Sequence, residues 1–113
     1  MIRKVYLFCN AGMSTSLMAS KMQKVADDHK IPVEVKAFPD GQIDKIVAES
    51  NPDVILLGPQ VKYLYEKITD KYGDSGKLID VIDQEDYGSM NGERVLKQVL
   101  INLKKQESEK KGK

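Results

Sequence analysis

The sequence predicts an α/β domain: a single open four-stranded parallel sheet, in the order 2-1-3-4, with helices on both faces. Four short runs of apolar or alternating residues recur along the chain, and each is followed by a segment whose apolar residues have helical spacing. Repeated strand-helix units of this kind build a parallel sheet. The length of 113 residues fits one compact domain with one sheet.

The four runs lie at residues 3–9, 32–38, 53–58 and 78–83. The first and third are apolar throughout, which is typical of strands covered on both faces, so they are expected in the centre of the sheet. The second alternates and the fourth carries Asp80, so both are expected at the edges. Short right-handed crossovers then give the strand order 2-1-3-4, which reverses direction between strands one and three.

The helices follow the strands. The spacing of Met18, Met22 and Val25 predicts a first helix over about residues 14–30. A shorter second helix follows the turn "FPDGQ", where Asp40 is expected to cap it. A third helix is predicted from Pro59, which suits a first helical position, to Gly73, which suits a helix end.

The last helix carries Val95, Val99 and Leu103 on its apolar face and then enters the charged sequence "KKQESEKKGK". Few apolar residues remain there to bury, so this end is expected to be disordered and solvated. The prediction is therefore one domain over residues 1–104 and a charged flexible tail over residues 105–113.

Composition and charge limit the possible partners. Eighteen Lys and Arg against seventeen Asp and Glu give a net charge of +1, which favours neither nucleic acid nor an anionic membrane. The start "MIRKVYLFCN" lacks the features of a secretory signal, and one Cys allows no intramolecular disulfide. No apolar stretch approaches the roughly 20 residues of a membrane helix. A cytoplasmic protein without direct membrane insertion is expected.

The only cysteine lies at the junction between the first strand and the first helix, in "LFCNAGMSTSLM". Cys9 ends strand one, beside the reversal of strand order where open α/β sheets bind ligands. Backbone amides of a small, hydroxyl-rich loop and a helix N-terminus can bind an oxyanion and favour a thiolate. We therefore expect Cys9 to attack a phosphoryl group that is then held by a phosphate-binding loop of Asn10, Ala11, Gly12, Met13, Ser14, Thr15 and Ser16.

Three interpretations of this junction stay open on the residues alone. A cysteine at a strand end can simply pack as a small apolar group beside an anion-binding or regulatory module. A cysteine phosphatase needs an Arg six residues after the nucleophile, and that position is Thr15. Of the two arginines, Arg3 starts strand one and Arg94 lies in the last helix, so neither is suited to the loop. Without Arg or a residue that activates water, the site favours a phosphoryl carrier over a hydrolase. No metal or organic cofactor is expected.

At these residues the sequence resembles the enzyme IIB components of the lactose and cellobiose (N,N'-diacetylchitobiose) type in the bacterial phosphoenolpyruvate-dependent sugar phosphotransferase system. The resemblance covers nearly the whole chain to about residue 104, through four motifs that occur in order: "YLFCNAGMSTSLM", "KAFP", "DVILLGPQVKY" and "VIDQEDYGSMNGERVLK".

The resemblance implies a phosphocysteine phosphotransferase. Cys9 would accept a phosphoryl group from a phosphohistidine of a IIA protein and pass it to a sugar bound by the membrane IIC permease. The sugar would be a β-linked disaccharide such as cellobiose, chitobiose or lactose, and the sequence does not identify which. The four-stranded parallel sheet of the family agrees with the fold predicted above.

Several residues besides the cysteine are candidates for a functional role. Pro59, Gln60, Tyr63 and Tyr87 are candidates for a site rim or partner contact, with Met13 as a further exposed apolar residue; ordinary packing is the alternative for each. Asp83 could serve a phosphatase as an acid, but a cap of the following turn is the favoured interpretation. His29 lies at the far end of the first predicted helix, about 20 Å from Cys9, and is expected to face solvent.

Overall fold

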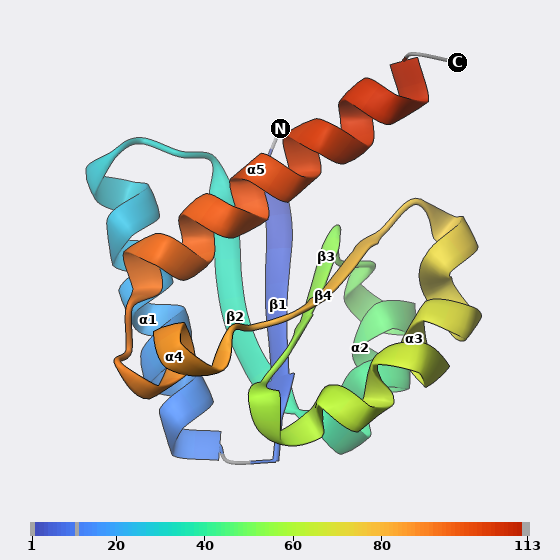
Figure 1. Ribbon diagram of the computed structural model, residues 1–113, viewed down its shortest axis with the longest axis horizontal. Helices are drawn as coiled ribbons and strands as arrows, with labels where there is room; N and C mark the ends of the chain where they lie inside the picture. Colours follow the sequence, from blue (N-terminus) through green and yellow to red (C-terminus); the bar gives the residue numbers. More distant parts are fainter. Residues whose placement is uncertain (1, 11, 112–113) are drawn as a thin grey trace.

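The computed structural model describes residues 2–10 and 12–111, and within them one parallel sheet (Figure 1). Its strands are β1 (Arg3–Cys9), β2 (Val33–Pro39), β3 (Val54–Leu57) and β4 (Leu78–Val81). They are all parallel and lie in the order β2-β1-β3-β4. The predicted fold class, strand order and positions of the strands are therefore confirmed.

Helices cover both faces of this sheet (Figure 1). Helices α1 (Gly12–Asp28) and α5 (Gly92–Lys111) pack on one face, and α2 (Ile43–Ser50) and α3 (Tyr65–Tyr72) on the other. The short helix α4 (Gln84–Gly88) joins β4 to α5. Three 3-10 turns, η1 (Asp40–Gln42), η2 (Pro59–Leu64) and η3 (Gly73–Ser75), complete the described elements.

Two apolar cores result because successive side chains of β1 point to opposite faces. Leu7 packs with Met22 of α1 and Leu96 of α5, whereas Phe8 packs with Ile46 of α2 and other residues of the second face. All of these side chains are buried. A central strand that is apolar on both faces is thus explained by two layers of helices.

The predicted third helix is divided in the structure. Pro59 does begin a helical segment, but the first six residues form the 3-10 turn η2, and Val61 has a non-helical φ of −118°. The regular helix α3 starts only at Tyr65 and ends at Tyr72. Val61 is fully buried, so packing of this side chain on the sheet coincides with the break in regular helix.

Asp40 does not cap the second helix, contrary to the prediction. It is the first residue of η1, Pro39 occupies the N-cap, and no side-chain hydrogen bond closes this end. Asp83, in contrast, is the N-cap of α4, and its carboxylate accepts hydrogen bonds from the backbone N–H groups of Glu85 and Asp86. The favoured interpretation of Asp83 is confirmed.

The last helix is longer than the sequence predicts. Helix α5 continues to Lys111 and so includes residues that were expected to leave the helix after residue 104. Gln106 Nε2 donates to the carbonyl of Gly76 at 2.9 Å, and Glu107 pairs with Arg3 of β1. These tertiary contacts hold the charged segment against the body of the protein. A division into a domain over residues 1–104 and a tail over residues 105–113 remains a prediction.

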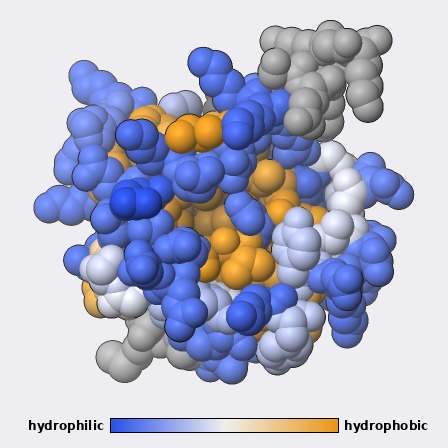
Figure 2. Space-filling view, in the orientation of Figure 1, coloured by the Kyte–Doolittle hydropathy of each residue, from blue (hydrophilic) through white to orange (hydrophobic). Residues whose placement is uncertain are grey.

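Among the residues that the structure describes, no helix is both long and apolar enough to span a membrane. Figure 2 shows apolar surface in the centre of the face viewed in Figure 1, with hydrophilic residues around it.

Candidate functional site

The site is built around Cys9, the last residue of β1, whose side chain is only 1% exposed. Its sulfur donates to Gln60 Oε1 at 3.1 Å, and Asn10 Oδ1 and the hydroxyl of Tyr87 each lie 3.9 Å from it. These partners come from three separate places in the chain: the end of β1, the η2 turn after β3, and α4 after β4. The topology therefore assembles the site at the carboxyl ends of the central strands, where the reversal of strand order predicts it.

Gly58 is required at this site because of space. Its φ of −64° is open to any residue, but a Cβ atom there would lie 2.7 Å from the Cys9 sulfur and 3.0 Å from Cys9 Cβ. The absent side chain lets β1 and β3 end close together and brings Gln60 within hydrogen-bonding distance of the thiol. Gly58 is not among the site residues predicted from the sequence, although its place directly after an apolar strand and before Pro59 indicates a position at the end of the sheet.

Tyr87 and Thr15 form a buried hydroxyl pair next to the thiol. Their oxygens lie 3.1 Å apart, Thr15 is 1% exposed and Tyr87 is 7% exposed. Tyr87 therefore lies at the site, but it is buried rather than exposed, because α4 folds its ring inward toward α1. Tyr63 is 70% exposed, as a rim residue should be, whereas the side chain of Met13 lies outside the described part.

The predicted phosphate loop over residues 10–16 is shorter than expected. Helix α1 begins at Gly12, so the backbone of Gly12, Met13 and Ser14 is already helical, while Ala11 lies outside the described residues. Thr15 is buried and Ser16 is exposed on α1. The first N–H groups of an α-helix have no acceptor within the helix, so the start of α1 directly after Cys9 and Asn10 is suited to bind an anion.

An open cavity of about 480 Å³ adjoins the thiol, lined by Pro59, Gln60, Lys62, Gln84, Tyr87 and Gly88. Gln60 is exposed, and both it and Tyr87 reach the sulfur from this cavity. The predicted pair Pro59 and Gln60 therefore lies at the site, and it forms one wall of the approach to Cys9.

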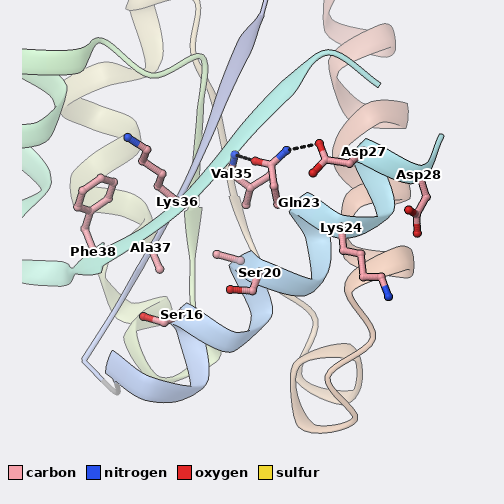
Figure 3. A pocket seen from close by; sticks show the side chains of 11 residues that line it. Ser16, Ser20, Gln23, Lys24, Asp27, Asp28, Val35, Lys36, Ala37 and Phe38 are labelled. Atoms are coloured by element: carbon pink, nitrogen blue, oxygen red, sulfur yellow. Dashed lines mark hydrogen bonds between the residues drawn. The ribbon is translucent and has the colours of Figure 1, made fainter. Parts of the chain in front are cut away.

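A second groove, of about 610 Å³, runs between α1 and the edge strand β2 (Figure 3). Gln23 Oε1 accepts from the backbone N–H of Val35 at 2.8 Å, and Gln23 Nε2 donates to the carbonyl of Val33 at 3.1 Å. The side-chain amide thus uses the edge groups that another strand would pair with, a protection against edge-to-edge association. None of the side chains that hydrogen-bond with the Cys9 sulfur lines this groove, whereas Gln60 and Tyr87 line the cavity of about 480 Å³, so the groove is not part of the candidate site despite its larger volume.

The charged groups that a hydrolase would use are engaged elsewhere. Arg3 pairs with Glu107, and Arg94 Nε lies 3.2 Å from the carboxylate of Asp86. His29 follows α1 as an exposed residue at the opposite end of that helix from Cys9. Within the described ranges, no group of three or more His, Cys, Asp or Glu side chains is placed to hold a metal ion. Among the described residues, the side chains that hydrogen-bond with the sulfur are two neutral amides and one hydroxyl, and Lys62 lines the adjoining cavity.

Comparison with known proteins identifies the family. The family model described as "PTS system, Lactose/Cellobiose specific IIB subunit" matches residues 4–98. This chain belongs to that family. IIB components are phosphotransferases of the sugar phosphotransferase system and normally work with IIA and IIC proteins.

Individual IIB relatives agree with this assignment. The cellobiose-specific EIIB component of Lactococcus lactis subsp. lactis is 44% identical over 81% of this chain and 88% of its own length. The galactose-specific EIIB component of Lactococcus lactis subsp. cremoris is 43% identical with the same coverage. The oligo-beta-mannoside-specific EIIB component of Bacillus subtilis is 30% identical over 88% of this chain and 94% of its own length.

Solved IIB structures have the same fold. The cellobiose-specific IIB component from Borrelia burgdorferi superposes with a TM-score of 0.70 at 33% identity, covering 91% of this chain and 92% of that one. The lactose-specific IIB domain from Streptococcus pneumoniae gives a TM-score of 0.78 at 20% identity, covering 88% and 96%, which supports the fold alone.

Proposed function

We propose that this IIB component carries a phosphoryl group on Cys9. The observation that carries the proposal is the position of the chain's single thiol, at the carboxyl end of β1, beside the start of α1 and one wall of an open cavity. A helix N-terminus stabilises the oxygens of a transferring phosphoryl group without a cationic side chain.

The proposed reaction has two transfers that balance. In the first, the Cys9 sulfur attacks phosphorus on a phosphohistidine of the IIA protein, the P–N bond breaks, the S–P bond forms, and the thiol proton ends on the histidine nitrogen. In the second, a hydroxyl oxygen of a sugar held by the membrane IIC permease attacks the same phosphorus. The S–P bond then breaks, and the hydroxyl proton restores the thiol.

The phosphate-binding residues proposed for this carrier are the short connection and first turn of α1: Asn10, Ala11, Gly12, Met13, Ser14, Thr15 and Ser16. The neutral surroundings of the sulfur support a carrier over a hydrolase, because a lasting phosphocysteine requires poor activation of water. Among the described side chains, the two arginines pair with carboxylates away from the thiol, so neither is available as a clamp.

For the sugar we propose a β-linked disaccharide such as cellobiose, chitobiose or lactose. The cellobiose-specific and galactose-specific relatives are nearly equally identical to this chain, so identity alone does not select one sugar. Selection of the sugar is assigned to the IIC permease, because the IIB component meets only the hydroxyl that is phosphorylated.

The test is intact-protein mass spectrometry after incubation with phosphoenolpyruvate, enzyme I, HPr and a cognate IIA protein. Wild type should gain one phosphoryl group and Cys9→Ser none. Labelling of Cys9→Ser to the wild-type level would overturn the assignment of Cys9. Failure of wild type with two IIA proteins that are themselves phosphorylated would overturn the carrier function and favour an anion-binding module.

A further inference from the structure

Among the residues that the structure describes, the side chains that hydrogen-bond with the Cys9 sulfur share one property: each can both donate and accept a hydrogen bond. Asn10 and Gln60 carry amides, and Tyr87 carries a hydroxyl. Gln60 makes the shortest of these contacts, at 3.1 Å against 3.9 Å for the other two. Its partner atom is the oxygen Oε1, so the thiol is the donor and the amide is the acceptor.

Phosphorylation changes Cys9 from a hydrogen-bond donor into a group that only accepts hydrogen bonds. A thiol has one proton to donate, whereas a phosphocysteine has none and presents only anionic oxygens that accept hydrogen bonds. An amide oxygen that faces these oxygens would be repelled. The same amide turned by half a rotation about its last torsion would present Nε2–H, which forms a charge-assisted hydrogen bond.

The surroundings of Gln60 leave room for this rotation. Its side chain is exposed and lines the open cavity of about 480 Å³, and Gly58 contributes no side chain between it and the thiol. Tyr87 is different, since its hydroxyl is buried and lies 3.1 Å from Thr15. Of the three side chains, Gln60 is therefore the one best placed to change its orientation when Cys9 is phosphorylated.

We infer that Gln60 is a positioning residue that reverses its amide between the two states of the carrier. In the resting protein Oε1 accepts from the Cys9 thiol, and in the phosphorylated protein Nε2 donates to a phosphoryl oxygen. This inference rests on the proposed phosphorylation of Cys9. Its consequence is that a neutral side chain stabilises both states and keeps the transfer reversible.

Two substitutions of Gln60 separate the two roles. Gln60→Glu keeps the length and the acceptor but loses the donor and adds a negative charge, whereas Gln60→Met keeps the length and loses both. The readout is the ratio of phosphorylated to unphosphorylated Cys9, measured by mass spectrometry at a fixed ratio of phosphoenolpyruvate to pyruvate. We expect this ratio to fall about fivefold in Gln60→Met and at least about tenfold in Gln60→Glu, or about 1.4 kcal/mol.

Gln84 provides the matched control for charge. It lines the same cavity on α4 and is not among the described hydrogen-bond partners of the sulfur, so Gln84→Glu adds the same charge without removing the proposed donor. We expect Gln84→Glu to stay within about twofold of wild type. If the ratio falls equally in Gln60→Glu and Gln84→Glu, the effect comes from added negative charge in the cavity and the inference is overturned. A wild-type ratio in Gln60→Met would also overturn it.

A direct readout is the side-chain amide of Gln60 in ¹⁵N-edited NMR spectra. Phosphorylation should move its amide proton downfield while the Gln84 amide stays in place; no change at Gln60 would overturn the reversal. Failure of the inference and of the proposed function remain distinguishable. A wild type that is not phosphorylated on Cys9 rejects the carrier, whereas a phosphorylated wild type with unaffected Gln60 variants rejects only the role of Gln60.

Discussion

Gly58→Ala tests whether close packing of the strand ends positions the thiol. The new Cβ would lie 2.7 Å from the Cys9 sulfur and 3.0 Å from Cys9 Cβ, whereas carbon atoms in good contact lie about 3.5 to 4.0 Å apart. Cys9 or the start of η2 must therefore move by about 1 Å. Such overpacking costs about 1 to 3 kcal/mol of unfolding free energy.

Part of the overpacking cost of Gly58→Ala is offset because alanine lowers the conformational entropy of the unfolded chain. The φ of −64° and ψ of 156° at Gly58 suit alanine, so the substitution gains about 0.4 to 1 kcal/mol by restricting the unfolded state. The net expectation is a loss of up to roughly 2.6 kcal/mol. Urea unfolding measures this loss. Labelling of Cys9 from a phosphorylated IIA protein should slow in parallel, because the sulfur is displaced from Gln60.

Gly41→Ala is the control, since a Cβ there would meet no atom within 4 Å. Gly58→Ala should also cost less in a Cys9→Ala background, where the sulfur that it meets is gone, by about 1 kcal/mol of coupling. If Gly58→Ala is as stable as Gly41→Ala, or if the cost is the same in both backgrounds, the close contact does not position the thiol.

Two further substitutions and one pH dependence test other parts of the fold. Gly92→Ala should lower the unfolding free energy by about 1 to 3 kcal/mol, because its Cβ would lie 2.8 Å from Lys21 Cβ and 3.0 Å from Lys21 backbone. Asp83→Ala should cost about 1 kcal/mol through loss of the α4 cap. Burial and the hydrogen bond to Glu34 raise the pKa of Tyr6 to about 12, above its usual value of 10.0, so stability present below pH 10 should be lost as pH rises toward 12, by up to about 2.7 kcal/mol. Urea unfolding measures the first two, and its pH dependence the third.

Each of these has its own control. Gly88→Ala meets no atom within 4 Å and should be nearly neutral, so an equal effect would contradict the close approach at Gly92. Asp83→Asn retains a capping oxygen and should recover most of the loss. Tyr6→Phe should remove the alkaline loss that is specific to Tyr6, and an unchanged difference between pH 9 and pH 12 would contradict the assignment.

The local pattern of the chain was sufficient to predict the fold and the position of the thiol. Strands covered by helices on both faces must be apolar throughout, so the runs at residues 3–9 and 53–58 identified the central strands and hence the strand order. Cys9 follows one of these strands directly, and every parallel strand ends at the same side of the sheet. The sequence therefore determined where the thiol lies.

Long-range packing decided the rest. The distance of Gly58 from Cys9 and the burial of Tyr87 against Thr15 depend on how segments more than 40 residues apart meet, which no local pattern records. The end of α5 was also misjudged, because its charged residues are held by tertiary contacts of Gln106 and Glu107 rather than by an apolar face. The sequence alone shows which chemical groups are available to form a site. Only the tertiary structure decides which of them face each other, since hydrogen bonds act over about 3 Å.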